Sequence, residues 1–116
     1  MRVKRYHQIF DIDNCNKNIN DGLFLKDYLQ KIASAIDMHI IGGPIIAEGI
    51  PENPGYSVLC IVDFSHISIH TFTDCNGILV DIFSCKNWNK EKIRKMLIEA
   101  FSTEKSEIRD KEVWWG

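Results

Sequence analysis

The chain has 116 residues, of which 45% are apolar and 26% are charged, a composition typical of one globular domain and not of a disordered chain. It contains 14 Lys and Arg residues against 16 Asp and Glu residues, which gives a net charge of −2. A nucleic-acid partner is therefore not expected, because neutralising phosphate groups requires a surplus of basic side chains.

Two features of the sequence argue against a membrane or secreted protein. The most apolar window, residues 38–50, is shorter than the roughly 18 apolar residues of a membrane span and is interrupted by Gly42, Gly43, Pro44 and Glu48. The N-terminal stretch MRVKRYHQIFDID lacks the apolar core of a signal peptide. The four cysteines form no CxxC pair, which is typical of free thiols in a reducing compartment: Cys15, Cys60, Cys75 and Cys85. We expect a cytoplasmic protein without a membrane partner.

The N-terminal third predicts a strand followed by a helix. Residues 3–12 alternate loosely between polar and apolar side chains, as in a half-buried strand. Residues 13–21 are rich in Asn and Asp, which favour turns and helix caps. From Phe24 to Ile36 the apolar residues recur at the i, i+3, i+4 spacing of an amphipathic helix, which Asn20 or Asp21 can cap.

The middle of the chain predicts a series of strands. Residues 38–47 resemble a strand interrupted at Gly42-Gly43-Pro44, and residues 49–55 have the composition of a loop. Three apolar segments follow at 57–62, 66–72 and 78–84. The Asn76-Gly77 pair between the last two favours a tight hairpin, because both residues tolerate positive φ.

The C-terminal part predicts a second helix and a last strand. Asn89 can cap a helix whose apolar stripe runs from Ile93 to Phe101, and Trp88 can pack on Ile93. Residues 107–115 predict the last strand. The order of elements predicts one α+β domain over residues 1–116, a two-layer sandwich with a mostly antiparallel sheet and two helices on one face.

The predicted hairpin separates two kinds of side chain. With the turn centred on Asn76-Gly77, His70 lies opposite Phe83. One face is then suited to burial: Ile67, Ile69, Thr71, Val80 and Ile82. The other is unusually polar: His66, Ser68, His70, Phe72, Leu79, Asp81, Phe83 and Cys85. This second face predicts either a catalytic cleft or a surface packed on a partner subunit, and a slip of one residue would separate His70 from Cys85.

A metal site is a poor explanation of this polar face. His66 and His70 are four residues apart, which on a strand is roughly 13 Å and too far to share one ion. We therefore expect no metal cofactor.

Two blocks of sequence identify a family. DFSHISIHTF, residues 63–72, and VDIFSC, residues 80–85, resemble the small prokaryotic S-adenosylmethionine decarboxylases, which typically read ESH-x-[ST]-IHTW and then VD-[VI]-F-[TS]-C. The spacing of the blocks and the helix after them also agree. The resemblance implies a carboxy-lyase that acts on S-adenosylmethionine in spermidine biosynthesis, as a homodimer of processed protomers.

The resemblance also implies that the protein makes its own cofactor, a covalent pyruvoyl group derived from Ser65. The Ser65 hydroxyl can attack the adjacent carbonyl of Phe64 and convert the amide into an ester. Removal of the Cα proton then eliminates the upstream chain. The products would be residues 1–64 and a chain from residue 65 to 116 that begins with a ketone, which can condense with a substrate amine and withdraw electrons as carbon dioxide leaves.

Three further residues match functional positions of the family. His70 matches the histidine that takes the Cα proton during cleavage, a role that suits a neutral imidazole. Ser57, eight residues before Ser65, matches a serine that assists processing. Cys85 matches the thiol that returns a proton to the substrate carbon. The expected hairpin register would place Cys85 near His70 in one cleft, with Ser65 on the opposite parity.

The sequence departs from the family pattern around this site. Phe64 stands where Glu is common, Phe72-Thr73-Asp74 replaces Trp-Pro-Glu, and Lys86-Asn87-Trp88 replaces the frequent Gly-Asp after the thiol. These changes leave two alternatives open. One is a pyruvoyl-dependent decarboxylase of arginine or ornithine, with Asp74 or Asp81 as anchor for the distal cation. The other is an uncleaved binding or regulatory subunit, against which the presence of Ser65, His70 and Cys85 together argues.

The last residues leave a further choice open. Trp114 and Trp115 can pack either at a subunit interface or over the core of their own protomer.

Overall fold

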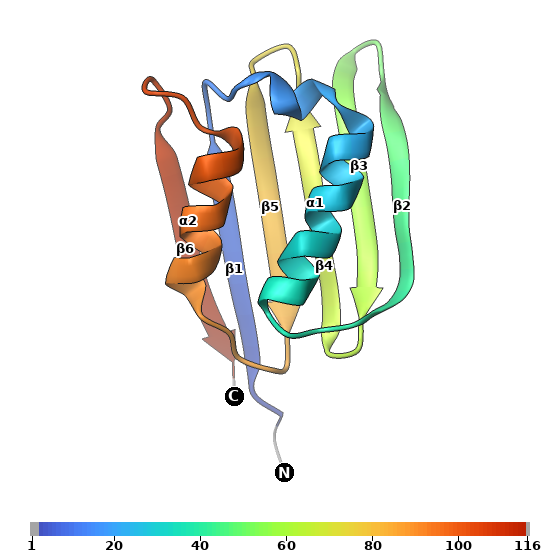
Figure 1. The fold of residues 1–116 in the computed structure, drawn as a ribbon, viewed down its shortest axis with the longest axis vertical. Helices are drawn as coiled ribbons and strands as arrows, with labels where there is room; N and C mark the ends of the chain where they lie inside the picture. Colours follow the sequence, from blue (N-terminus) through green and yellow to red (C-terminus); the bar gives the residue numbers. More distant parts are fainter. Residues whose placement is uncertain (1–2, 116) are drawn as a thin grey trace.

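Six strands form one antiparallel sheet in the computed structural model, which describes residues 3–115 (Figure 1). The strands are β1 (Arg5–Ile12), β2 (Ile40–Ile50), β3 (Asn53–Val62), β4 (Ser65–Phe72), β5 (Gly77–Ser84) and β6 (Ile108–Trp115). They lie side by side in the order β2-β3-β4-β5-β1-β6. The helices are the 3-10 helix η1 (Lys17–Asn20), α1 (Gly22–Ala35) and α2 (Lys90–Phe101).

The helices begin where the cap residues predict. The Asp21 carboxylate accepts a hydrogen bond from the backbone N–H of Phe24 at 3.1 Å, and the Asn89 side chain accepts one from Lys92 at 3.1 Å. Their apolar stripes are buried against the sheet: Leu25, Leu29 and Ile32 from α1, and Ile93, Leu97 and Phe101 from α2. The predicted α+β sandwich with two helices on one face is confirmed.

The predicted loop over residues 49–55 is wrong in most of its length. Ile50 pairs with Asn53, so only Pro51 and Glu52 form the turn between β2 and β3. Two-residue turns are the commonest connection of antiparallel strands, and Pro at the first loop position fixes the negative φ of a type I or II turn. The Gly and Pro residues of this segment therefore shape a hairpin end rather than a free loop.

The hairpin of β4 and β5 has a different register from the predicted one. His70 pairs with Leu79 and Phe72 with Gly77, so the loop spans residues 73–76 and His70 does not face Phe83. The positive φ of 52° falls on Asn76, the last loop residue, and Gly77 begins β5. The structure adopts the longer loop, because a four-residue loop also accommodates one Asn with a positive φ. Since both registers keep the same parity, the predicted sorting of side chains onto two faces is correct.

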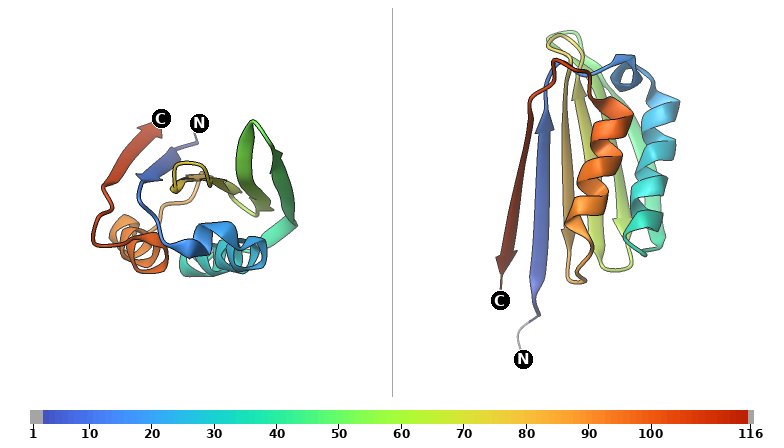
Figure 2. Two further views of the ribbon diagram at one scale, coloured as in Figure 1. Left: turned by 90° about the horizontal axis from the view of Figure 1, so that it is seen from above. Right: turned by 60° about the vertical axis from the view of Figure 1, so that its left-hand side comes forward.

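The two faces of the sheet differ in their cover. Both helices lie on one face, and the sheet edges bend away from them, so the other face is concave (Figure 2). We call this second surface the open face. It carries, among others, Ser57, Leu59 and Ile61 of β3, His66 and His70 of β4, Leu79, Asp81 and Phe83 of β5, and His7 of β1. The protomer itself supplies no helix to cover these side chains, within the part of the chain that the structure describes.

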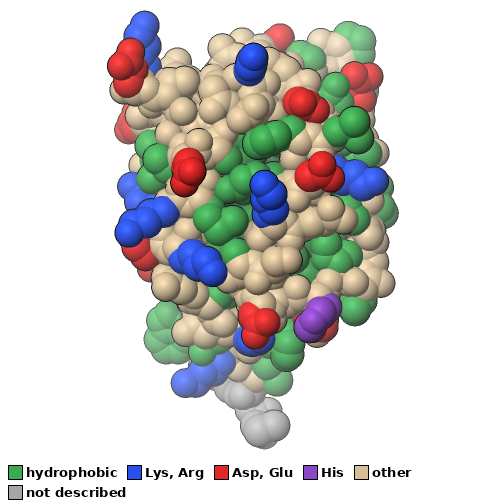
Figure 3. Space-filling model, viewed as in Figure 1, with side chains coloured by type: hydrophobic (Ala, Val, Ile, Leu, Met, Phe, Trp, Pro, Cys, Tyr) green, Lys and Arg blue, Asp and Glu red, His purple; other side chains and the backbone are tan. Residues whose placement is uncertain are grey.

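The helix side carries charges of both signs. Figure 3 shows Lys, Arg, Asp and Glu side chains scattered over α1 and α2 with apolar patches between them. No sign dominates this face, which agrees with the net charge of −2. Over residues 3–115, none of the helices has the length and apolar character that crossing a bilayer requires.

Candidate active site

The turn between β3 and β4 places backbone strain on Ser65. Val62 pairs directly with Ser65, which leaves Asp63 and Phe64 as a two-residue loop. Such loops favour positive φ at one or both loop residues, yet here the positive φ falls on the next residue, Ser65, at 154°. Side chains with a Cβ rarely adopt this conformation, which costs on the order of 1–3 kcal/mol. The strain thus lies next to the bond that joins residues 64 and 65.

His39 holds this turn in place. The Asp63 carboxylate accepts hydrogen bonds from the His39 backbone N–H and lies 3.0 Å from its Nδ1, while the Asp63 N–H donates to the His39 carbonyl at 2.9 Å. Desolvation raises the pKa of Asp63, but the hydrogen bonds to His39 together outweigh it, so the pKa lies below its usual value. His39 was not predicted as part of the site, because no motif connects it with Asp63 along the chain.

The carbonyl group of Phe64 is bound from the neighbouring strand. Ser65 pairs with Ser84 at the end of β5, and the next residue, Cys85, donates its backbone N–H to the Phe64 carbonyl oxygen at 3.0 Å. The Cys85 thiol is exposed. An N–H aimed at a carbonyl oxygen stabilises the negative charge that develops there when a nucleophile attacks the carbon. The structure therefore brings Ser65, the Phe64 carbonyl and Cys85 together at one end of the sheet.

Ser57 and His70 form a second pair near the other end of the same strands. They are directly opposed across β3 and β4, and the Ser57 hydroxyl oxygen lies 2.8 Å from Nδ1 of His70. Both side chains are half-buried on the open face. The contact fixes the orientation of the imidazole, and when Nδ1 carries the proton it leaves Nε2 free to act as a base.

The two pairs do not meet within one protomer. Ser65 and His70 are five residues apart on β4, which at about 3.3 Å per residue is roughly 16 Å. The prediction that His70 and Cys85 share one cleft of a single chain is therefore wrong. Its cause is the register: His70 faces Leu79, six residues before Cys85.

A cluster that the sequence did not predict lies between the two pairs. Nε2 of His7 on β1 lies 2.6 Å from a carboxylate oxygen of Asp81. The rings of His7 and His66 flank the ring of Phe83, and each ring centroid lies 5.4 Å from that of Phe83. His7 pairs with Phe83 across β1 and β5, strands that are about 75 residues apart in the chain. Only the sheet order reveals that His7 joins the polar open face.

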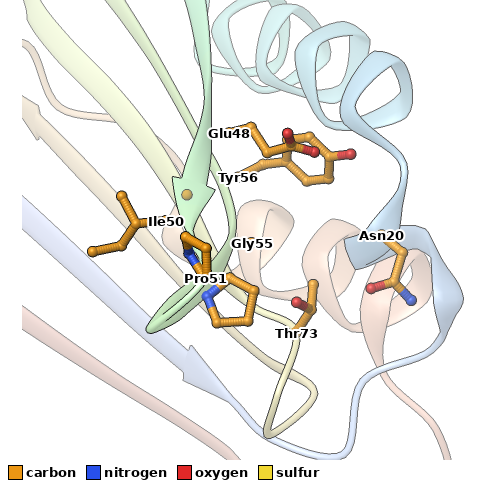
Figure 4. A pocket seen from close by; sticks show the side chains of 9 residues that line it. Asn20, Glu48, Ile50, Pro51, Gly55, Tyr56 and Thr73 are labelled. Carbon is orange, nitrogen blue, oxygen red and sulfur yellow. The ribbon is translucent and has the colours of Figure 1, made fainter.

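A pocket of about 540 Å³ lies away from these residues. It opens beside the β2–β3 turn on the helix side, where Figure 4 shows Glu48 and Tyr56 at one side, Asn20 at the other and Thr73 nearby. None of Ser57, Ser65, His70 and Cys85 lines it. Ser57 and His70 lie instead on the concave open face, and Ser65 and Cys85 lie at the end of the sheet where β4 begins and β5 ends.

Comparisons with known proteins agree with the two motifs. The family model described as S-adenosylmethionine decarboxylase matches residues 6–112. The S-adenosylmethionine decarboxylase proenzyme of Clostridium botulinum (strain Loch Maree / Type A3) is 32% identical over 112 residues, which cover 95% of this chain and 94% of that protein. The arginine decarboxylase proenzyme of Caldivirga maquilingensis is 31% identical over 70 residues, 60% of this chain and 52% of that protein.

A solved structure has the same fold. The crystal structure of the adenosylmethionine decarboxylase from Aquifex aeolicus VF5 matches 96% of this chain and 91% of that chain, with a TM-score of 0.73 and 18% identity. The family model and the relative from Clostridium botulinum confirm the predicted family and the predicted enzyme class, a carboxy-lyase. The chain belongs to the S-adenosylmethionine decarboxylase family.

Proposed function

We propose that this protein decarboxylates S-adenosylmethionine with a pyruvoyl group that it makes by cleaving its own chain between Phe64 and Ser65. The observation that carries this proposal is the geometry at that bond. Ser65 has the strained φ of 154°, and the carbonyl oxygen of Phe64 accepts the Cys85 N–H at 3.0 Å. Strain in the reactant and a donor aimed at the developing oxyanion both lower the barrier to attack by the serine hydroxyl.

The cleavage balances with one water molecule. The Ser65 Oγ attacks the Phe64 carbonyl carbon, the C–N bond breaks, and an ester and a free amine result. A base then removes the Ser65 Cα proton, the Cβ–O bond breaks, and Phe64 leaves as a carboxylate. The remaining enamine takes up water and releases ammonia, so that residue 65 becomes a ketone. Residues Ser65 and Cys85 fit this group, since both lie at the accessible end of the sheet.

We assign the base to His70, oriented by Ser57, and propose that both come from a second copy of the chain. Within one protomer His70 is roughly 16 Å from Ser65. Two open faces packed face to face with their strands antiparallel would bring the Ser57–His70 pair of one chain to the Ser65 end of the other. The exposed apolar side chains Leu59, Ile61 and Leu79 on this face support such an interface. The functional unit would be a homodimer of processed protomers.

After cleavage the residues of the chain would serve decarboxylation. The pyruvoyl group supplies a ketone that binds the substrate amine and accepts electrons as carbon dioxide leaves. The Cys85 thiol then donates a proton to the substrate carbon, from a position next to residue 65. The concave open face, closed by the second copy, would exclude water. The product would supply aminopropyl groups for spermidine synthesis in the cytoplasm.

A second substrate class has specific support. The relative from Caldivirga maquilingensis is named an arginine decarboxylase proenzyme, and this chain departs from the common family pattern at Phe64, Phe72 and Asp74. A pyruvoyl group can act on any amino acid whose amine reaches it, so the remaining side chains decide between substrates. Arginine or ornithine would need a carboxylate for the distal cation, and Asp74 or Asp81 could supply it.

The release of carbon dioxide from three carboxyl-labelled substrates, compared side by side, tests this function. We expect purified protein to release it fastest from S-adenosylmethionine and much more slowly from arginine and ornithine, and we expect Ser65→Ala to abolish release. A faster reaction with arginine or ornithine would move the assignment to the second substrate class. A cleaved protein that is inactive on all three would contradict both.

A further inference from the structure

The proposed cleavage creates a charge without a counterion. Hydrolysis of an ordinary peptide bond leaves a carboxylate and an ammonium group side by side. Here, if the proposed function holds, the nitrogen of Ser65 leaves as ammonia and the new chain end is a neutral ketone. The carboxylate at Phe64 therefore remains alone in an exposed turn, and such a charge is more stable with a cation nearby.

Lys86 is the cation that the fold places beside this position. It follows Cys85, whose N–H holds the Phe64 carbonyl at 3.0 Å, and its Nζ lies 5.1 Å from the centre of the Phe64 ring. Its backbone N–H donates to the buried Ser84 hydroxyl at 2.9 Å, which fixes the start of the side chain. Phe64 and Lys86 are also two of the positions at which the chain departs from the family pattern, and they contact each other.

The present partners of Lys86 leave it free to move to a new one. Its Nζ donates to the Asp37 backbone carbonyl at 2.9 Å and lies 3.5 Å from the Asp37 carboxylate. That carboxylate side chain is 94% exposed, so water and salt screen the pair and it contributes little stability. Asp63, the other nearby acid, is already bound by His39.

We propose that Lys86 is a positioning residue that pairs with the carboxylate formed at Phe64 on cleavage. The Lys86 side chain starts one residue beyond the amide that binds the Phe64 carbonyl, so its four methylene groups can bring the ammonium to the same oxygen atoms. The pair forms only after the bond is broken. The pair holds the end of chain 1–64 against chain 65–116. It also keeps the new carboxylate away from the ketone, so that the carboxylate of a substrate can fit beside the ketone.

A comparison of cleaved and uncleaved protein tests this proposal. Lys86→Met is made in the self-cleaving chain and in the Ser65→Ala chain, which keeps the neutral amide. We expect it to lower the thermal midpoint of the cleaved protein by about 4 °C or more and to change that of the uncleaved chain much less. Lys86→Arg should retain the thermal midpoint of the cleaved protein. The difference between the Lys86→Met effects on cleaved and uncleaved protein should shrink in 1 M salt. Lys95→Met, on the exposed side of α2, is the matched control and should act equally in both chains.

Each other result would overturn the proposal. Equal shifts in the cleaved and uncleaved chains would give Lys86 a purely structural role. If Arg5→Met instead lowered the thermal midpoint of the cleaved protein alone, the pairing would belong to Arg5, which precedes the partner of Ser84 on β1. A Lys86→Met chain that stays uncleaved would place Lys86 in the cleavage step. A wild-type chain that stays intact would overturn the proposed function as well. A wild-type chain that is cleaved, together with equal Lys86→Met shifts of the thermal midpoint in cleaved and uncleaved protein, would overturn the pairing alone.

Discussion

The hydroxyl of Ser57 lies 2.8 Å from Nδ1 of His70, on the same two strands as Ser65 but near their opposite ends. Each protomer thus holds the cleavable bond at one end of its open face and the predicted base near the other. Under the proposed function, a second copy of the chain would supply the missing group.

Complementation between two inactive chains tests that arrangement. His70→Ala keeps Ser65 but lacks the base, and Ser65→Ala keeps the base but has no hydroxyl. We expect each chain alone to stay intact and the co-expressed pair to yield fragments of the His70→Ala chain only, because its partner supplies His70. The two chains can be told apart by mass. Efficient cleavage of His70→Ala on its own would contradict both the assigned base and the shared site.

The Cys85 thiol should matter for turnover and not for cleavage. Cys85→Ala keeps the backbone N–H that binds the Phe64 carbonyl, so the variant should be processed. Carbon dioxide release should fall by a factor of about 100 or more, as expected for the loss of a proton donor. Cys75→Ala, in the exposed β4–β5 turn, is the control and should retain both functions. Normal turnover in Cys85→Ala would remove its role.

The hydrogen bonds between His39 and Asp63 should influence the rate of cleavage. Asp63→Asn weakens the bonds that fix the strained turn, so fragments should form several-fold more slowly in cell-free synthesis followed by electrophoresis. Glu52→Ala, in the two-residue turn at the opposite end of β3, is the control and should cleave at the wild-type rate.

The pH dependence of this effect follows from the lowered pKa of Asp63. A carboxylate with a lowered pKa stabilises the folded turn above its unfolded pKa of about 4 and loses that contribution as the pH falls through the folded pKa. Wild-type cleavage should therefore keep this contribution at neutral pH and lose it only in acid. Equal rates for wild type and Asp63→Asn at pH 7 would contradict the role of the turn.

Trp88 should stabilise the segment that carries Cys85 and Lys86. Its Nε1–H donates to the side-chain oxygen of buried Gln8 at 2.8 Å. Trp88→Phe leaves that oxygen unpaired and should lower the free energy of unfolding by about 1–3 kcal/mol, measured by urea denaturation of the uncleaved Ser65→Ala chain. Adding Gln8→Leu removes the second partner and should restore part of the loss. An unchanged urea midpoint in Trp88→Phe would contradict this account.

The local features of this fold could be predicted from the sequence, and the long-range ones could not. Asp21 and Asn89 mark the helix starts because a cap acts on residues two or three positions away. Strand parity fixed which side chains share a face, since it depends only on alternation. The register of β4 and β5 depends on the whole loop 73–76, and several loop geometries suit an Asn-Gly pair.

The candidate site shows the same division between local features, which the sequence predicts, and long-range contacts, which it does not. The motifs around Ser65 and Cys85 identified residues that the structure brings together through one hydrogen bond. His7 and His39 were missed because they reach Asp81 and Asp63 from distant parts of the chain. The separation of His70 from Ser65 follows from strand spacing alone, since five residues along β4 span roughly 16 Å.

A denaturing mass spectrum of the purified wild-type protein tests the central claim, self-cleavage between Phe64 and Ser65, most directly. We predict two fragments of roughly 7 and 6 kDa, in proportion to residues 1–64 and 65–116 of a chain of 13.4 kDa. Together they should weigh one water more and one ammonia less than the intact chain, because residue 65 ends as a ketone. A single intact mass, or fragments that have gained water without losing ammonia, would contradict the account.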